Sequence, residues 1–226
     1  MGDNMKYYNY TLKIGILNIL SIILFILCFI IVVPIYGVIT LTNIPLMMIL
    51  SILYLMLHEV VHYIGFIINK EVNSKNIVMG AELEKGIFYC MCKQKISKKT
   101  ILISIFAPLT TLGFITLIIA MIFKLDLLIF LSILNISGSI GDIIMGLFIM
   151  FLPKDIMYLD LDDSTSFTLL CKEDINDRKF IGIQLLNSGE YKESMKAKDY
   201  TKFKISKLSY IIIILFFIFA LLLFML

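Results

Sequence analysis

Long apolar runs separated by short polar segments set the pattern of this chain. Five runs are each long enough for a helix that crosses a bilayer, which takes about 20 residues. They extend over Ile14 to Val33, Ile44 to Ile68, Thr100 to Phe123, Leu127 to Leu152 and Leu208 to Leu226. Pro108 lies in the first half of the third run and predicts a kink there, with a freed backbone carbonyl that needs another partner.

Composition agrees with this pattern. Of the 226 residues, 60% are hydrophobic and the mean hydropathy is +0.96, values typical of an integral membrane protein. We therefore expect an all-α membrane protein with about five transmembrane helices and a small cytosolic β-hairpin or loop element. The expected organisation is a membrane-embedded core of four spans over residues 1–153, a cytosolic segment over 154–207, and a C-terminal transmembrane helix over 208–226.

The basic residues predict the orientation of these spans. With the N-terminus in the cytosol, nineteen of the twenty Lys and Arg residues fall on the inner side, and only Lys124 falls outside. The N-terminus and the large loops are then cytosolic, and the C-terminus is outside, in a multi-pass protein of the plasma membrane. The basic stretch from Tyr191 to Lys207 suits contact with anionic membrane lipid, and no nucleic-acid-binding motif is present.

Two polar segments contain strand formers. Gly80 to Lys95 includes a run from Ile87 to Cys92 after a glycine, which predicts a hairpin that dips toward the membrane core. Met157 to Leu161 and Ser166 to Cys171 flank a turn-forming stretch and predict a strand, a turn and a second strand.

The second apolar run contains the sequence His58-Glu59-Val60-Val61-His62. These are the only two histidines of the chain, and Glu59 is the only charged residue between Ile14 and Asn69. Residues four apart share a helix face, so His58 and His62 are positioned to bind one metal ion. Glu59 lies about 100° around the helix from His58, which suits activation of a water molecule rather than ligation. Hydrogen bonding to neighbouring membrane helices is the alternative role for such residues.

A catalytic zinc ion usually has three protein ligands, so a third ligand is required. Asp142 is the only charged residue between Leu127 and Pro153. His58 and Asp142 each precede the cytosolic end of their run by about ten residues, which places both about 15 Å into the bilayer. We therefore predict Asp142 as the third ligand, with a structural hydrogen bond near Pro108 as its alternative role. The rival ligands lie outside the apolar runs; they are Glu82, Glu84, Asp155 and Asp160.

Three residues are candidates for holding a substrate. Asn135 lies two turns before Asp142 on nearly the same helix face, where it can hold a substrate carbonyl or bond to the third span. Phe88 and Tyr89 lie in the predicted hairpin, whose edge can pair with an extended peptide. A cytosolic loop without catalytic importance is the alternative for this segment.

With these residues the chain resembles site-2-protease-type intramembrane zinc metallopeptidases, and more closely a small family of zincin peptidases from bacterial membranes. The resemblance covers roughly Leu50 to Leu170. It is carried by four elements, which are the His58-to-His62 motif, Tyr89-Cys90, Ala107-Pro108 and Gly141-Asp142. It implies a bacterial plasma membrane protein that hydrolyses peptide bonds near the membrane. It also implies a zinc ion bound by His58, His62 and Asp142, with Glu59 as the base.

Two other functions are compatible with the sequence. In a metal- or proton-coupled transporter the same ligands would form a transit site, and in a catalytically inert regulatory or immunity protein they would have no chemical role. Hydrolysis requires a carboxylate at Glu59, whereas a two-histidine transit site does not. The substrate and the oligomeric state are not specified by the sequence.

Overall fold

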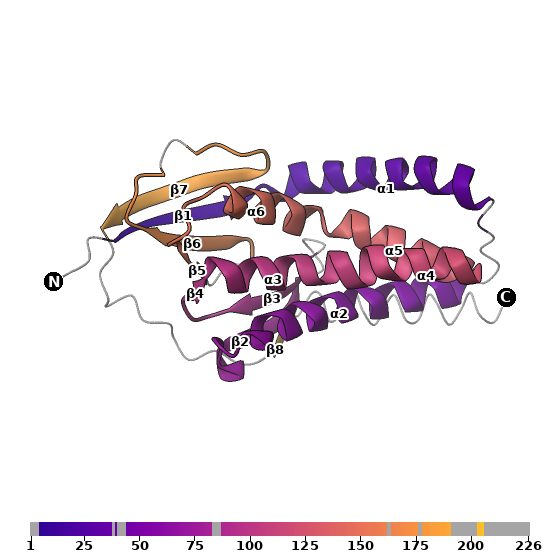
Figure 1. The fold of residues 1–226 in the computed structure, drawn as a ribbon, viewed down its shortest axis with the longest axis horizontal. Coiled ribbons are helices and arrows are strands. Elements are labelled where there is room, and N and C mark those ends of the chain that lie inside the picture. Colours follow the sequence, from indigo (N-terminus) through magenta and orange to yellow (C-terminus); the bar gives the residue numbers. More distant parts are fainter. Residues whose placement is uncertain are drawn as a thin grey trace.

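The computed structural model describes residues 5–37, 39, 44–82, 87–161, 164–175, 178–190 and 203–205. Its long helices run side by side along the longest axis of the molecule, and its strands gather at one end of that axis (Figure 1). The first helix begins at this end and the second ends there, so the chain returns to the strands after each pair of helices.

Three helical segments are long and apolar enough to cross a membrane. They are α1 (Ile14–Tyr36), α2 (Ile44–Ile68) and the continuous segment Lys98–Phe123. The last of these consists of α3 (Lys98–Pro108), the π-helical turn η3 (Leu109–Ile115) and α4 (Thr116–Phe123). The predicted bounds of α2 agree with the structure, and the kink expected at Pro108 takes the form of the π-helical turn.

The fourth predicted span is broken. It consists of α5 (Asp126–Gly138) and α6 (Ile140–Met150), which are bent by 46° at Ser139. The pair counts as a fourth span if it is treated as one unit, so the described residues contain three or four candidate spans. The fifth predicted span, residues 208–226, lies outside the described residues.

The expectation of an all-α fold is wrong, because the chain also forms a five-stranded antiparallel sheet and is therefore a mixed α/β protein. The strand order is β4-β5-β6-β1-β7. These strands are β1 (Lys6–Leu12), β4 (Ile96–Ser97), β5 (Met157–Asp160), β6 (Ser166–Cys171) and β7 (Ile183–Glu190). The predicted strand-turn-strand over 157–171 is confirmed as the β5–β6 pair.

The strand β1 explains why the sheet is hard to see in the sequence. It is an interior strand, because it pairs with β6 on one side and β7 on the other, over 150 residues away in each case. Tyr8 and Tyr10 are fully buried in it, and their hydroxyls donate to the carbonyls of Glu173 and Ile175. Tyrosine favours strands but contributes little to hydropathy, and pairing over such a distance leaves no local turn signal.

The hairpin predicted in the polar segment is also present. It consists of β2 (Ile77–Glu82) and β3 (Ile87–Cys92), in a second sheet of order β3-β2-β8. The third strand, β8 (Phe203–Ile205), pairs with β2 in parallel. Strand β3 packs against α2, so one edge of this sheet lies beside the helix that contains the two histidines.

The five-stranded sheet supports α6. The ring of Phe148 on α6 meets Tyr10 edge to face at 5.1 Å, and Tyr10 stacks on Phe167 of β6 at 5.7 Å. The hydroxyl of Tyr158 on β5 also reaches the sulfur of Met145 at 3.8 Å. The sheet therefore fixes the direction of α6 after the bend. Strands from before and after residue 153 share this sheet, so the segments 1–153 and 154–207 pack together through their described strands. The predicted domain division at residue 153 stays a prediction.

Helices α2 and α3 approach each other closely at Gly65. A Cβ at this position would lie 2.6 Å from the Cα of Ser104, which is backbone and cannot rotate away. We therefore expect Gly65→Ala to separate the two helices and to reduce the free energy of unfolding by about 1–3 kcal/mol. The measurement is the thermal unfolding midpoint in detergent. Gly15→Ala in α1 is the matched control, since its added Cβ would meet no described atom within 4 Å outside its own helical turn. Equal midpoints for the two variants would contradict this packing.

Candidate metal centre

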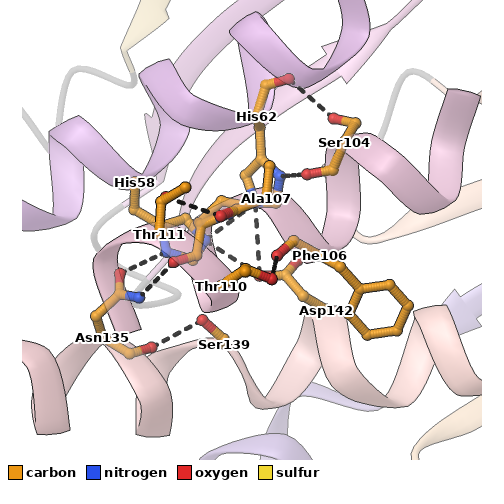
Figure 2. A network of polar contacts seen from close by, with 11 residues as sticks. His58, His62, Ser104, Phe106, Ala107, Thr110, Thr111, Asn135, Ser139 and Asp142 are labelled. Atoms are coloured by element: carbon orange, nitrogen blue, oxygen red, sulfur yellow. Dashed lines mark hydrogen bonds and ion pairs between the residues drawn. The ribbon is translucent and has the colours of Figure 1, made fainter. Parts of the chain in front are cut away.

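Both histidines of α2 are buried, and their side chains come together as the helical spacing predicts. Their Nε2 atoms lie 3.0 Å apart, and the rings meet edge to face. Each ring makes its other contact through Nδ1. The Nδ1 of His58 lies 2.8 Å from Oδ1 of Asn135, and the Nδ1 of His62 lies 2.8 Å from the carbonyl oxygen of Ser104 (Figure 2).

These contacts determine the tautomer of each ring. Both Nδ1 partners are oxygen atoms that only accept hydrogen bonds, so each Nδ1 donates, and in the neutral form of each ring Nε2 presents its lone pair. Such outer contacts orient histidine ligands in metal sites. Two neutral imidazoles in this form would repel each other across 3.0 Å, so a proton or a metal cation has to lie between the two Nε2 atoms.

Pro108 explains why the Ser104 carbonyl is free to accept from His62. Proline has no backbone N–H, so the carbonyl four residues earlier, which is that of Ser104, lacks its helical partner. His62 supplies the missing donor. In return the hydroxyl of Ser104 donates to the backbone carbonyl of His62 at 2.9 Å, so α2 and α3 exchange two hydrogen bonds at the site. Beyond Pro108, the hydroxyls of Thr110 and Thr111 donate to the carbonyls of Phe106 and Ala107 (Figure 2).

Asp142 lies in the first turn of α6, immediately after the bend. Its Oδ2 lies 3.1 Å from Nε2 of His58 and 3.4 Å from Nε2 of His62. The proximity of Asp142 to both imidazoles, predicted from matched depths of two helices, is therefore present in the structure. The side chain is 18% exposed, so the carboxylate is largely removed from water at a position where it needs a positive partner.

The three converging atoms fit a zinc ion. Tetrahedral zinc with bonds of about 2.0–2.1 Å separates its ligand atoms by roughly 3.3 Å, close to the separations seen here. Two imidazole nitrogens and one carboxylate oxygen form a ligand set of the kind found in catalytic zinc sites, which keep one position open. Geometry and donor chemistry therefore both suit a divalent cation at this point.

Glu59 lies next to the triangle formed by Nε2 of His58, Nε2 of His62 and Oδ2 of Asp142, here called the metal triangle. Its carboxylate and the two histidines offer ligand atoms that all lie within 4.8 Å of one another. It lines a cavity of about 550 Å³, whose walls come from α1, α2, β3, the α5–α6 bend and the β5–β6 region. Asp142 and Asp160 line the same cavity. The site thus combines a triangle of three potential metal ligands, an adjacent carboxylate and an open space for a ligand.

Asn135, predicted to hold either a substrate carbonyl or the third span, has both polar atoms engaged inside the protein. Its Oδ1 accepts from His58, and its Nδ2 donates to the carbonyl of Pro108 at 3.1 Å. The residue is fully buried. These contacts favour orientation of His58 and the bond to the third span over contact with a substrate.

Phe88 and Tyr89 both line the cavity, but their side chains lie on opposite faces of β3 because alternate residues of a strand do so. Tyr89 packs with Val78 and Met91 in a small cluster of the hairpin. Cys90 packs on the other face, against the main core. Phe88 shares that face with Cys90. Their predicted role in substrate binding stays a prediction.

Of the rival ligands that the structure describes, only Asp160 lines the cavity. Glu82 accepts from the hydroxyl of Ser164, Asp155 lies away from the cavity walls, and Glu84 lies outside the described residues. The two oxygens of Asp160 accept from the Tyr158 hydroxyl at 2.5 Å and from the Cys92 backbone N–H at 2.6 Å. Burial raises the pKa of Asp160 to about 6, although these hydrogen bonds oppose the rise.

Sequence reasoning missed the outer contacts of both imidazoles and the anchoring of Asp160. The signal for His62 was available, since Pro108 marks the carbonyl of Ser104 as free. No comparable signal existed for Asp160, because its partner Cys92 lies in a different sheet.

Part of the chain is similar to a known family of proteins. Residues 51–157 match a family model described as "Putative zincin peptidase". The matched segment is just under half of the chain, and it includes both histidines, Glu59, Asn135 and Asp142. No curated protein matches the chain, and no solved structure matches it either. The zincin-like segment ends at the first residue of β5, so α1, β1 and most of the five-stranded sheet lie outside the match.

The raised pKa of Asp160 predicts a pH dependence. Its carboxyl has a pKa of 3.8 when free and about 6 in the fold, so the folded state binds the proton more tightly. Its contribution to stability is therefore fully present below pH 4 and is lost as the pH rises through 6. We expect wild-type protein without metal to lose up to about 3 kcal/mol relative to Asp160→Asn between pH 4 and pH 7. Thermal unfolding of both proteins across this range measures the difference, and parallel curves would rule the effect out.

Proposed function

We propose that the chain is an intramembrane zinc metalloprotease of the site-2 type. In this proposal it hydrolyses peptide bonds of a membrane-bound or membrane-associated substrate. The observation that carries the proposal is the convergence of Nε2 of His58, Nε2 of His62 and Oδ2 of Asp142 within 3.0–3.4 Å, with Glu59 alongside. The match of residues 51–157 to a zincin peptidase model supports the same chemistry.

His58, His62 and Asp142 are the proposed ligands. A zinc ion there would supply Lewis acidity, which makes water a nucleophile near neutral pH and polarises a carbonyl group. Asn135 and the Ser104 carbonyl keep the two imidazoles in the tautomer and orientation that ligation needs. The negative charge of Asp142 favours retention of the cation.

Glu59 is the proposed general base. It follows the first ligand directly on α2 and lines the cavity beside the metal triangle, so its carboxylate is placed to accept a proton from the attacking water. The same carboxyl group then returns this proton to the nitrogen of the leaving amine. The apolar walls of the cavity limit the access of competing water.

Strand β3 is the proposed docking strand for the substrate. It is an edge strand of its sheet among the described residues, it packs against α2, and residues Ile87 to Met91 line the cavity. A peptide bond inside a helix has its carbonyl bonded within that helix, so a substrate has to be extended before cleavage. Pairing with β3 would hold it extended and would satisfy its backbone groups.

The proposed setting is a bacterial plasma membrane, with the strands on the cytosolic side. The end of the bundle with the strands is where α1 begins and α2 ends. Lysines of β1, of the start of α3 and of the loops between strands and helices lie at this end. Lys124 lies at the opposite end, in the turn between α4 and α5. This separation of charge agrees with positive residues inside. The proposed ligands His58, His62 and Asp142 lie on the apolar helices α2 and α6.

The ligand and base roles make separable predictions. We expect about one zinc ion per purified wild-type chain, and loss of that zinc in His58→Ala and in Asp142→Ala. Glu59→Gln should keep the zinc and reduce hydrolysis about 10²–10⁴-fold, because only proton transfer is removed. Metal analysis and cleavage of a fluorogenic peptide library measure the two properties. Zinc flux into proteoliposomes that survives Glu59→Gln would favour a transporter instead.

The orientation of His58 can be tested separately. Asn135→Ala removes the acceptor from Nδ1 of His58, and we expect zinc affinity to fall about 10–100-fold. Ser137→Ala is the matched control on α5, because its hydroxyl bonds only to the carbonyl of Leu134. Competition with a fluorescent chelator measures both variants. An unchanged zinc affinity combined with a raised KM would instead assign Asn135 to the substrate.

A further inference from the structure

Asp160 lies where the two sheets meet, and its carboxylate contacts the edge of β3. The backbone N–H of Lys93 donates to the carbonyl of Asn76, just beyond the β2–β3 pairs. In an antiparallel pair the backbone groups of alternate residues face the partner strand. The backbone N–H and C=O groups of Met91, Tyr89 and Ile87 therefore point toward β2, as those of Lys93 do.

The backbone groups of the residues in between point away from β2. Phe88, Cys90 and Cys92 direct their N–H and C=O groups toward the edge of β3 that pairs with no described strand. The hydrogen bond from the Cys92 N–H to Asp160 Oδ2 agrees with this direction. One of the three outward-facing residues is thus already bonded through its N–H, and the other two lie along the cavity.

The carboxylate of Asp160 is held in place from its own sheet. Its second oxygen accepts from the hydroxyl of Tyr158, whose side chain is 2% exposed and stacks on Phe167 at 5.5 Å. Lys93 provides a second link nearby, since its amine donates to the carbonyl of Leu161. The same end of β3 is therefore tied twice to the β5–β6 region.

We propose that Asp160 is a positioning residue that closes one end of the free edge of β3 and so sets the register of an extended peptide bound there. The proposal rests on the proposed function, because it assumes that the substrate pairs with β3. The carboxylate takes the N–H that the carbonyl of a pairing strand would otherwise take. Pairing is then limited to Phe88 and Cys90.

Register decides which peptide bond is cleaved. The backbone pattern of an edge repeats every two residues, and a slip by one residue turns every side chain to the opposite face. Because Asp160 already holds the Cys92 N–H, a peptide cannot pair in the register that lies two residues further along β3, and pairing stops at Cys92. The peptide carbonyl presented to the metal triangle is thereby defined by the protein instead of by the substrate alone.

A set of peptide hydroxamates of increasing length can measure this stop. The hydroxamate group binds zinc and fixes one end of the peptide, and two series with the group at either terminus cover both directions along β3. In wild-type protein we expect each residue that pairs with β3 to tighten binding about 3- to 10-fold, until the peptide reaches Asp160. Beyond that length the affinity should stay constant.

Two variants distinguish the stop from a purely structural contact. In Asp160→Ala the Cys92 N–H is free, so the length at which affinity becomes constant should increase by two residues in one series. Asp160→Asn keeps an oxygen acceptor and should behave as wild type. Identical length profiles in all three proteins would overturn the proposal. Failure of every hydroxamate to bind zinc-loaded wild-type protein would instead overturn the proposed function.

Hydrogen exchange of the wild-type protein gives a test that needs no variant. The amide of Cys92 should already be protected without peptide, whereas the amides of Phe88 and Cys90 should become protected only when the longest hydroxamate is bound. Protection of the Cys92 amide that first arises on peptide binding would contradict its capture by Asp160.

Discussion

The hydrogen bond from Nδ1 of His62 to the carbonyl of Ser104 is the interaction on which the centre depends. It exists because Pro108 leaves that carbonyl without a helical donor. In an apolar environment an unpaired carbonyl costs several kcal/mol, so the bond is strongly favoured. It fixes the tautomer of one histidine and ties α2 to α3, and Gly65 lets the two helices approach closely enough to form it.

The second histidine is held in an equivalent way by the same region of the third span. Asn135 joins the Nδ1 of His58 to the carbonyl of Pro108, so both imidazoles are oriented through carbonyls of a disturbed helix. The π-helical turn after Pro108 and the bend at Ser139 are two irregularities of the described helices, and both lie next to residues of the site. Irregular backbone in apolar surroundings is tolerated where it lines a cavity or is bonded by neighbours, and both conditions hold here.

Much of the helical part could be predicted from the sequence, because an uncharged apolar run of about 20 residues is typical of a membrane-spanning helix. The histidine pair and the proximity of Asp142 followed from helical spacing and from matched depth. The five-stranded sheet could not be predicted, since β1 pairs with strands more than 150 residues away and its buried residues are tyrosines. The segment after the bend at Ser139 packs against that sheet, so its direction could not be predicted either. Asn135 stands out in the sequence, but its hydrogen bond to His58 joins two helices whose packing the sequence does not specify.

The interior position of β1 has a consequence for biosynthesis. A ribosome produces Lys6–Leu12 first, yet both neighbours of this strand, β6 and β7, are made last among the elements of the sheet. Until residue 190 has been translated, the sheet lacks its final strand and α6 lacks its complete support. Pairing over such sequence separations is slow as well. We therefore expect the carboxylate of Asp142 to reach its final place only after β6 and β7 have been translated, so a nascent chain that stops before β6 does not possess an assembled centre.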